Sequence, residues 1–304
     1  MMEALARGWQ RWRERTRPWI MAIRPRTLTI GISPVIVGTT VAWMEGARID
    51  LAVFAAALLA AAAIQTGTNL HNDAADAGAD AIGRLGPPRV TALGLLPAAS
   101  VRRAAFAAFA LAFILGIWLV VKGGWPILVI GLLSIAAGLA YSGGPRPISH
   151  TPLGELFVVL FFGLAGTAGS YWLQAQTLSP RAVVAGLIVG LPAAAVLLVN
   201  NTRDVMQDAA AGRRTLAILL GKRRAAIVYA TLLLAPYALL LLPWPGFANL
   251  SGRLPWPALI TLPYALWLVR QFWRKPIEYF NLLLVNTAKL QFALSALLAL
   301  ALVQ

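Results

Sequence analysis

Residues 102–121 read RRAAFAAFALAFILGIWLVV, and this stretch sets the class of the protein. After its two arginines, the run continues to Val121 without a charged side chain. A helix of this length can cross the hydrocarbon core of a bilayer, which is about 30 Å thick. Similar runs recur along the chain, and they are apolar on all sides rather than alternating, which favours helices over a β-barrel. The sequence therefore predicts an all-α membrane protein.

Nine such segments are expected to be transmembrane helices. They cover residues 27–44, 51–69, 102–121, 125–141, 154–175, 182–199, 225–242, 255–269 and 283–303. Before them, Leu5, Trp9 and Trp12 recur at helical spacing among arginines, as in an amphipathic helix on a membrane surface. We therefore expect a basic amphipathic N-terminal segment, residues 1–26, and a single transmembrane domain, residues 27–304.

The composition excludes several other classes of protein. Hydrophobic residues make up 59% of the chain and charged residues 12%, whereas soluble proteins have about 45–50% and about 25%. There is no cysteine, which excludes a disulfide-stapled fold, a thiolate metal site and a cysteine nucleophile. The net charge of +15 could suggest nucleic acid as a partner, but in a membrane protein excess Lys and Arg usually marks the cytoplasmic loops. We expect membrane lipid, and no nucleic acid, around this chain.

The distribution of positive charge predicts the orientation. If the N-terminus is cytoplasmic, the cytoplasmic segments hold most of the 26 Lys and Arg residues. The loops on the other side hold only Arg48, Lys122, Arg181 and Arg253. This asymmetry predicts a multi-pass protein of the cell (inner) membrane with a cytoplasmic N-terminus. Nine spans then put the C-terminus outside.

The placement of the acidic residues carries most of the functional information. Five of the 11 carboxylates fall in two short segments that follow the second and the sixth span. The segments share one pattern: Asn72, Asp76 and Asp80 in the first, with Asp73 beside them, and Asn200, Asp204 and Asp208 in the second. On a helix, positions i, i+4 and i+8 share a face, and like charges there are destabilising unless a cation lies between them.

The ligand types in these stripes favour Mg²⁺, because it prefers hard oxygen donors. Mg²⁺ binds one or two carboxylates and completes its coordination with water and substrate phosphates. Both spans would run inward, so the two halves resemble parallel repeats, and two facing stripes would suit a diphosphate. The expected metal ligands are Asn72, Asp76, Asp80, Asn200, Asp204 and Asp208. The alternatives are helix caps that balance nearby arginines, or an ion pathway, which would instead need carboxylates in mid-span.

The two segments read Asn72-Asp73-Ala74-Ala75-Asp76-Ala77-Gly78-Ala79-Asp80 and Asp204-Val205-Met206-Gln207-Asp208. With them, the chain resembles the UbiA superfamily of intramembrane aromatic prenyltransferases. More narrowly, it is similar to the 1,4-dihydroxy-2-naphthoate polyprenyltransferases of menaquinone synthesis. The supporting stretches are RPRTL at 24–28, QTGTN at 65–69, RLGPPRVT at 84–91, YSGGP at 141–145, NNTRD at 200–204 and GRRTL at 212–216. The resemblance covers nearly the whole chain from about residue 20.

This resemblance implies a helical bundle with a central cavity that is capped at the cytoplasmic face. A polyprenyl diphosphate would bind with its tail among the helices and its head between the two Asp segments, bridged by Mg²⁺, expected as two ions. The prenyl group would pass to 1,4-dihydroxy-2-naphthoate with loss of the ring carboxylate. The expected catalytic residues are Asp73, Asp76, Asp80, Asp204 and Asp208. The expected substrate-binding residues are Asn72, Arg89, Tyr141, Arg146, Asn200, Arg203, Arg213 and Lys222.

Three points stay open from the sequence. Tyr141 could face the allylic cation with its ring, or it could be an interfacial tyrosine. Another acceptor is possible, namely homogentisate, 4-hydroxybenzoate or a tetrapyrrole. In a different class, the same arginines could serve a transporter of an anionic metabolite. Mg²⁺-dependent release of pyrophosphate would identify the enzyme, whereas movement of an unchanged solute into vesicles would identify the transporter.

Overall fold

The computed structural model describes residues 16–75, 85–87, 89–243 and 255–303, and this part of the chain is helical without a strand. Two metal ligands expected from the first motif, Asp76 and Asp80, lie outside the described residues. The longer helices are α2 (Pro25–Met44), α3 (Leu51–Ala75), α4 (Ala98–Gly123), α5 (Trp125–Ser142), α8 (Pro180–Arg203), α10 (Leu216–Leu241) and α13 (Phe280–Val303). The shorter elements are η2 (Ile148–His150), α6 (Gly154–Val159), η3 (Leu160–Ala165), α7 (Gly166–Ala175), α9 (Val205–Ala210), α11 (Trp256–Leu259), α12 (Leu262–Arg274) and η4 (Ile277–Tyr279).

The expected all-helical membrane fold is confirmed. Within the described residues, eight helices are long and apolar enough to cross a membrane, with α6, η3 and α7 forming one continuous span. The remaining expected span, 255–269, differs in form: it is built from α11 and α12, which extend to Arg274 and are separated by a turn at Ile260 and Thr261. Ala265, Leu268 and Phe272 form the buried side of α12. This helix therefore packs against the bundle along a single face.

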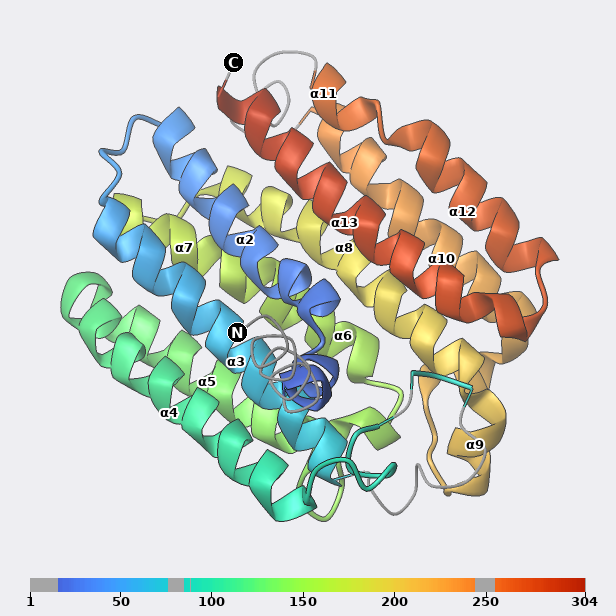
Figure 1. The fold of residues 1–304 in the computed structure, drawn as a ribbon. Helices are drawn as coiled ribbons and strands as arrows, with labels where there is room; N and C mark the ends of the chain where they lie inside the picture. The colour runs from blue at the N-terminus through green and yellow to red at the C-terminus, as the bar shows by residue number, and fades with distance from the viewer. Residues whose placement is uncertain (1–15, 76–84, 88, 244–254, 304) are drawn as a thin grey trace, which may run out of the picture.

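The helices lie side by side in a single layered bundle (Figure 1). α4 and α5 lie at one edge, α10 and α12 lie at the other, and α2, α8 and α13 lie between them. The ends of α3 and α8 point to the same edge of the bundle, where α9 also lies, whereas the C-terminal end of α13 lies at the opposite edge (Figure 1). The fold thus brings the two expected motifs to one end, as two parallel halves require.

The span from α6 to α7 lies very close to α8 because glycines face one another. A Cβ atom added at Gly190 of α8 would lie 2.7 Å from the Cα of Gly163, and one added at Gly186 would lie 3.0 Å from the Gly163 carbonyl oxygen. Small residues four apart commonly allow such close packing of membrane helices. Gly163 lies in the π-helical turn η3. This contact fixes α6 against the end of α8 that carries the second motif.

The described part of the N-terminal segment, residues 16–23, is helical and precedes α2. Its Trp19 and Ala22 pack in a cluster with Leu70 of α3 and Val101 of α4. The backbone turns at Arg24, which has a φ of 56°, before α2 begins at Pro25. The other residues expected to form the amphipathic face, Leu5, Trp9 and Trp12, lie outside the described residues.

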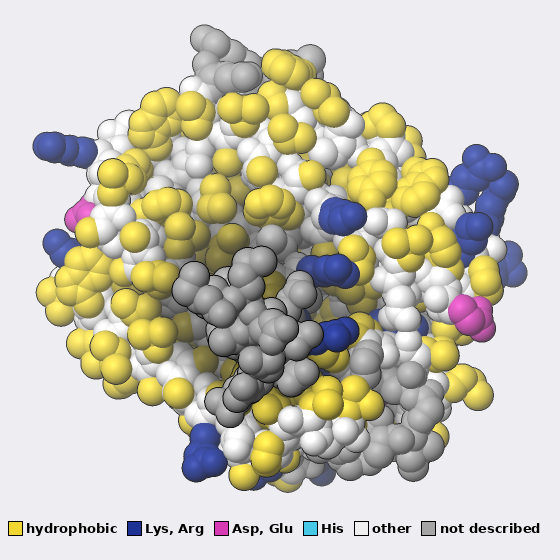
Figure 2. Space-filling view, viewed as in Figure 1, with side chains coloured by type: hydrophobic (Ala, Val, Ile, Leu, Met, Phe, Trp, Pro, Cys, Tyr) yellow, Lys and Arg dark blue, Asp and Glu magenta, His cyan; other side chains and the backbone are white. Residues whose placement is uncertain are grey.

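The surface fits a lipid environment. Hydrophobic side chains cover much of the face shown in Figure 2. The helices α4 and α5 expose large apolar side chains, including Ile114, Val121, Trp125 and Leu133. Water would not favour so much exposed apolar area in a monomer, but lipid does.

Candidate active site

The second motif lies where α8 ends and α9 begins. Asn200 and Asn201 lie in the last turn of α8, Asp204 is the residue between the two helices, and Asp208 lies in α9. The helix is interrupted at Asp204, which has φ −95° and ψ 10°. Even so, the Asp204 N–H donates to the Asn200 carbonyl at 3.2 Å, and the Asp208 N–H donates to the Asp204 carbonyl at 2.8 Å. These bonds preserve the spacing that puts the motif on one face.

Each carboxylate of this motif is paired with an arginine. The Arg203 Nε donates to Asp204 Oδ1 at 2.8 Å, and its Nη2 donates to Asp204 Oδ2 at 2.6 Å. Arg213 Nη1 donates to Asp208 Oδ1 at 3.1 Å. Arg203 is 2% exposed, and two-pronged pairs of this kind are strong because both donors match the two carboxylate oxygens.

Arg203 also joins the second motif to more distant segments. Its Nη2 donates to Asn200 Oδ1 at 2.8 Å, and its Nη1 donates to Asn281 Oδ1 of α13 at 3.0 Å. The Asn281 Nδ2 in turn donates to the carbonyl of Leu85, which follows the first motif. The sequence predicts that Arg203 binds substrate. Its guanidinium bonds to one carboxylate and two amides, and Arg203 also lines the large cavity of the bundle.

The first motif ends α3. Asn72 Nδ2 donates to Ser142 Oγ at 2.5 Å, which joins α3 to the end of α5. Asp73 is buried, and its carboxylate accepts hydrogen bonds from the Thr91 N–H, the Thr91 hydroxyl and the Val90 N–H. Asp73, which the sequence places among the catalytic residues, thus holds the loop that carries Arg89.

Residues from both motifs line one small polar cavity of about 40 Å³. Its lining contains Asn72, Arg89, Tyr141, Asn200, Asp204, Asp208 and Arg213, all expected from the sequence, and Ser149, Asn201 and Gln207, which are not. Ser149 comes from the short turn η2, which no sequence motif marks. Asn201 follows the expected residue Asn200, but it is not one of the positions four apart that define the motif.

Two residues expected to bind phosphate line neither this cavity nor the larger apolar cavity of the bundle. Lys222 is exposed, and its ammonium group donates to the Lys275 carbonyl at 2.9 Å and lies 5.8 Å from the Phe280 ring centre. Arg146 is exposed in the segment between α5 and η2. Neither side chain is part of the described site, because sequence distance from a motif does not fix distance in space.

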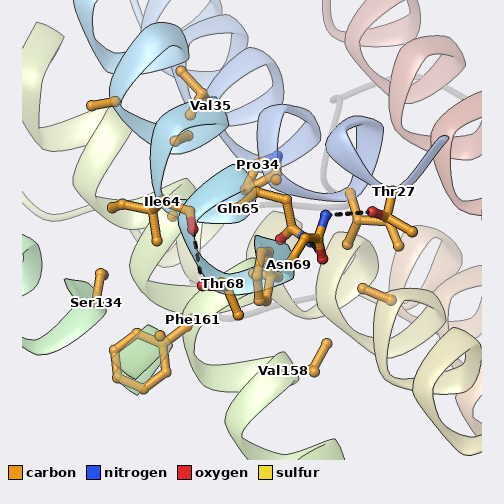
Figure 3. Close-up of a pocket in the computed structure, with 18 of the residues that line it drawn as sticks. Thr27, Pro34, Val35, Ile64, Gln65, Thr68, Asn69, Ser134, Val158 and Phe161 are labelled. Atoms are coloured by element: carbon orange, nitrogen blue, oxygen red, sulfur yellow. Dashed lines mark hydrogen bonds between the residues drawn. The ribbon is translucent and has the colours of Figure 1, made fainter. Parts of the chain in front are cut away.

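The larger cavity, of about 1450 Å³, extends from the polar cavity into the bundle. It is lined mainly by apolar side chains of α2 to α8 and α13, and it shares Asn72, Tyr141 and Asn200 with the polar cavity. Figure 3 shows Val35, Ile64, Val158 and Phe161 around part of it. A polar chamber therefore meets a long apolar one at a common wall.

One polar group of the large cavity has a fixed direction. Asn69 Nδ2 donates to the Ile23 carbonyl at 2.8 Å and to Thr27 Oγ1 at 3.0 Å (Figure 3). The carbonyl can only accept, so Asn69 Oδ1 is left to accept from Gln65 Nε2, at 3.2 Å. Gln65 is 8% exposed, and its Oε1 has no partner among the described residues. A buried hydrogen-bond acceptor without a partner among the described residues thus lies in the wall of an apolar chamber.

Comparison with known proteins identifies the family. A model of the UbiA prenyltransferase family matches residues 31–278. The chain belongs to this family. The two cavities described above are therefore cavities of a UbiA prenyltransferase.

The relatives of this UbiA prenyltransferase agree with that assignment. It is 36% identical over 228 residues to the 1,4-dihydroxy-2-naphthoate octaprenyltransferase of Escherichia coli, a match that covers 72% of this chain and 74% of the relative. It is 33% identical over 236 residues to the protein of the same name from Bacillus subtilis, covering 77% and 74%. These matches extend through most of the transmembrane region.

Solved structures share the fold. A UbiA homologue from Archaeoglobus fulgidus, bound to GPP and Mg²⁺, has a TM-score of 0.66 at 16% identity, and the match covers 94% of this chain and 100% of the homologue. The apo structure of a UbiA homologue from Aeropyrum pernix has a TM-score of 0.67 at 15% identity, with 90% and 96% covered. At these identities the likeness concerns the arrangement of helices.

The described residues fit a divalent cation of the hard type. The polar cavity presents two carboxylates, Asp204 and Asp208, and several side-chain amides, which are oxygen donors of the kind that Mg²⁺ prefers. Within the described part of the chain, no group of three acidic or histidine side chains comes together. A carboxylate has about four lone-pair positions, so Asp204 and Asp208 can bind a cation while they stay bonded to arginine.

Proposed function

We propose that this chain transfers a polyprenyl group from a polyprenyl diphosphate to 1,4-dihydroxy-2-naphthoate, with loss of the ring carboxylate. The observation that carries the proposal is the common wall of the two cavities at Asn72, Tyr141 and Asn200. A small charged chamber joined to a large apolar one matches a molecule with a diphosphate head and a long hydrocarbon tail. The names of the relatives in Escherichia coli and Bacillus subtilis support this acceptor.

Mg²⁺ would be held by Asp204, Asp208 and the cavity amides, together with Asp76 and Asp80 of the first motif, with two ions bridging the diphosphate. The bound metal would stabilise the negative charge that develops on the departing pyrophosphate. Arg89 and Arg213, which line the same cavity, would add charge-assisted hydrogen bonds to phosphate oxygens. Asp73 would act through the loop of Arg89, as a positioning residue.

The bond changes balance without a further reactant. The carbon–oxygen bond to the diphosphate breaks, its electron pair leaves with pyrophosphate, and the allylic carbon becomes electron-poor. An electron pair of the aromatic ring forms the new carbon–carbon bond, and that ring carbon loses a proton. Carbon dioxide leaves the neighbouring carbon, which takes up a proton in its place. The apolar walls keep water away from the allylic cation, which would otherwise be hydrolysed.

Gln65 supports an acceptor that carries a hydroxyl group. Gln65 lines the large cavity, and the chain of amides from Ile23 fixes its orientation, which leaves its buried Oε1 without a partner among the described residues. Gln65 precedes Asn72 by two helical turns on α3, which places it about 10 Å deeper in the bundle on the same face. A small rotation of the Gln65 side chain would bring this oxygen to the cavity, where a ring hydroxyl would donate to it. Gln65→Leu should therefore raise the KM for the naphthoate and leave the KM for the prenyl diphosphate unchanged.

The function is tested in membranes that contain this protein, Mg²⁺, a polyprenyl diphosphate and 1,4-dihydroxy-2-naphthoate, with the lipid extract analysed by mass spectrometry. We expect a prenylated product without the carboxylate, which disappears in Asp208→Ala. Product from homogentisate or 4-hydroxybenzoate alone would keep the reaction and replace the acceptor. Folded protein that releases no pyrophosphate with any acceptor, but moves an anionic solute into vesicles, would refute the enzyme.

We also propose that the polar cavity lies on the cytoplasmic side of the cell membrane. The chain has no cysteine, so single cysteines report the orientation without background. Arg146→Cys lies at the end of the bundle where α5 finishes, and Arg48→Cys lies between α2 and α3 at the other end. In intact cells, a membrane-impermeant maleimide should label Arg48→Cys and not Arg146→Cys. The reverse pattern would overturn the orientation.

A further inference from the structure

One buried carboxylate has no role in either motif. Glu155 of α6 is 5% exposed, and its side chain accepts a single hydrogen bond from another residue, from Asn201 Nδ2 to Oε1 at 2.9 Å. Its Oε2 is buried and has no partner among the described residues. A buried carboxylate without a cation costs several kcal/mol, so a fold that retains one within a membrane span commonly does so for function.

The bond from Asn201 fixes the direction of that amide. Because Asn201 Nδ2 donates to Glu155 Oε1, the end of the amide that faces Glu155 is the nitrogen. The oxygen of the same amide must then point away from α6. Asn201 lines the polar cavity, and its Oδ1 accepts no hydrogen bond from the described residues. An amide oxygen is thus held open at the place where the charged head of the substrate would lie.

The neighbouring asparagine is in the opposite situation. The sequence register points to Asn200 as the amide ligand of the second motif, four residues before Asp204. In the structure, however, Asn200 Oδ1 already accepts a hydrogen bond from Arg203 Nη2 at 2.8 Å. Of two adjacent asparagines in the cavity wall, Asn201 is the one whose oxygen accepts no hydrogen bond from the described residues, so both of its lone pairs are open.

We propose that Asn201 Oδ1 is a ligand of the divalent cation in the polar cavity and that Glu155 is the positioning residue that aims it. This inference rests on the proposed function. It adds to the second motif one oxygen ligand, from Asn201, and one carboxylate, that of Glu155 in α6, which bonds to this ligand. Outer partners of this kind orient metal ligands, and their loss typically weakens metal binding 10- to 100-fold.

Binding of Mn²⁺ in place of Mg²⁺ tests the proposal without turnover. The full-length protein in lipid nanodiscs is titrated with Mn²⁺ in the presence of inorganic pyrophosphate, and free Mn²⁺ is measured by electron paramagnetic resonance. We expect Asn201→Leu and Glu155→Leu each to raise the Kd for Mn²⁺ about 10- to 100-fold. Glu155→Gln should bind as the unchanged protein does, because its Oε1 still accepts from Asn201. Asn286→Leu, which removes an amide of α13 that lines neither cavity, is the matched control.

A reciprocal pair of substitutions separates orientation from folding. Asn201→Asp places two carboxylates within hydrogen-bond distance, with no proton donor between them, and should lose Mn²⁺ binding. In the double variant Asn201→Asp with Glu155→Gln, the amide nitrogen lies on α6 and donates to the carboxylate introduced on α8. The second oxygen of that carboxylate then faces the cavity, so Mn²⁺ binding should return to at least the original affinity. Recovery in the double variant excludes a merely structural role of this hydrogen bond when Asn201→Asp alone loses binding without a change in its unfolding temperature.

The outcomes distinguish this inference from the function on which it rests. If Asp208→Asn abolishes Mn²⁺ binding while Asn201→Leu and Glu155→Leu bind normally, the inference is wrong and the proposed metal site stands. If Asp208→Asn binds Mn²⁺ normally, the metal site itself is refuted. Variants that lose binding are compared by thermal unfolding, and a loss of binding with an unchanged unfolding temperature supports the inference. Failure of the double variant to recover binding, when it is folded, overturns it.

Discussion

The depth of the large cavity should limit the length of the prenyl chain, and Gly131 is the position where this can be tested. Gly131 lies on α5 and lines the cavity, and a Cβ atom added there meets no atom within 4 Å. It precedes Tyr141, at the polar end, by ten residues of helix, which corresponds to about 15 Å. A phenylalanine at this position would fill the chamber about 15 Å below the site of reaction, without a clash in the protein itself.

The expected effect is a loss of activity that depends on chain length. A tail that reaches the introduced phenyl ring must displace the ring or bend, and overpacking of this kind costs about 1–3 kcal/mol. This corresponds to roughly a 5- to 150-fold fall in kcat/KM. Gly131→Phe should therefore impair long polyprenyl diphosphates and leave short ones unaffected.

The assay measures kcat/KM with a series of prenyl diphosphates of increasing length, using purified protein in nanodiscs. Leu133→Phe is the matched control, because Leu133 lies on the same helix, is 54% exposed and does not line the cavity. An equal fall for short and long chains would mean that Gly131→Phe damages the fold. No fall for any length would mean that the tail does not occupy this cavity.

Three further predictions concern packing, the buried arginine and the metal. Gly190→Ala should lower the unfolding temperature, because its Cβ would lie 2.7 Å from the Cα of Gly163, whereas Gly116→Ala, with no atom within 4 Å, should not; equal unfolding temperatures would contradict the close helix contact. Arg203→Met should destabilise the protein by about 3–5 kcal/mol in chemical unfolding, because it removes both prongs of the buried ion pair to Asp204, and a change below about 1 kcal/mol would show that the pair contributes no more than an exposed one. Treatment with EDTA should abolish prenyl transfer, and added Mg²⁺ should restore it; transfer that persists in EDTA would exclude a metal-dependent reaction.

The fold could be predicted from the sequence because a bilayer allows few solutions. Apolar runs such as residues 102–121 must be helical in lipid, where every backbone group needs a partner within the helix. The expected span 255–269 shows the limit of this reasoning. It contains Pro257 and Pro263, and the structure forms two short helices with a turn at Ile260 and Thr261, because composition gives the apolar length but not the point at which a helix breaks.

The candidate site could be predicted in part, most directly where helical spacing fixes the residues. Asn72, Asp204 and Asp208 are fixed by helical spacing, which puts residues four apart on one face, and all three line the polar cavity. Lys222 and Arg146 are expected in the site because the family resemblance implies that these basic residues contact phosphate. Both are exposed and line neither cavity, since the direction of a loop side chain depends on packing that no spacing rule describes.

The buried arginine explains why sequence alone could not assign the remaining roles. A guanidinium next to an aspartate pattern fits phosphate and carboxylate equally well, because both offer two oxygens in one plane. In the structure, Arg203 bonds to both oxygens of Asp204 and, through Asn281, to the segment that follows the first motif. The same guanidinium occupies the oxygen of Asn200. A single side chain thus links the second motif to the segment after the first, and it also bonds to the oxygen of one of the two adjacent asparagines and not to that of the other.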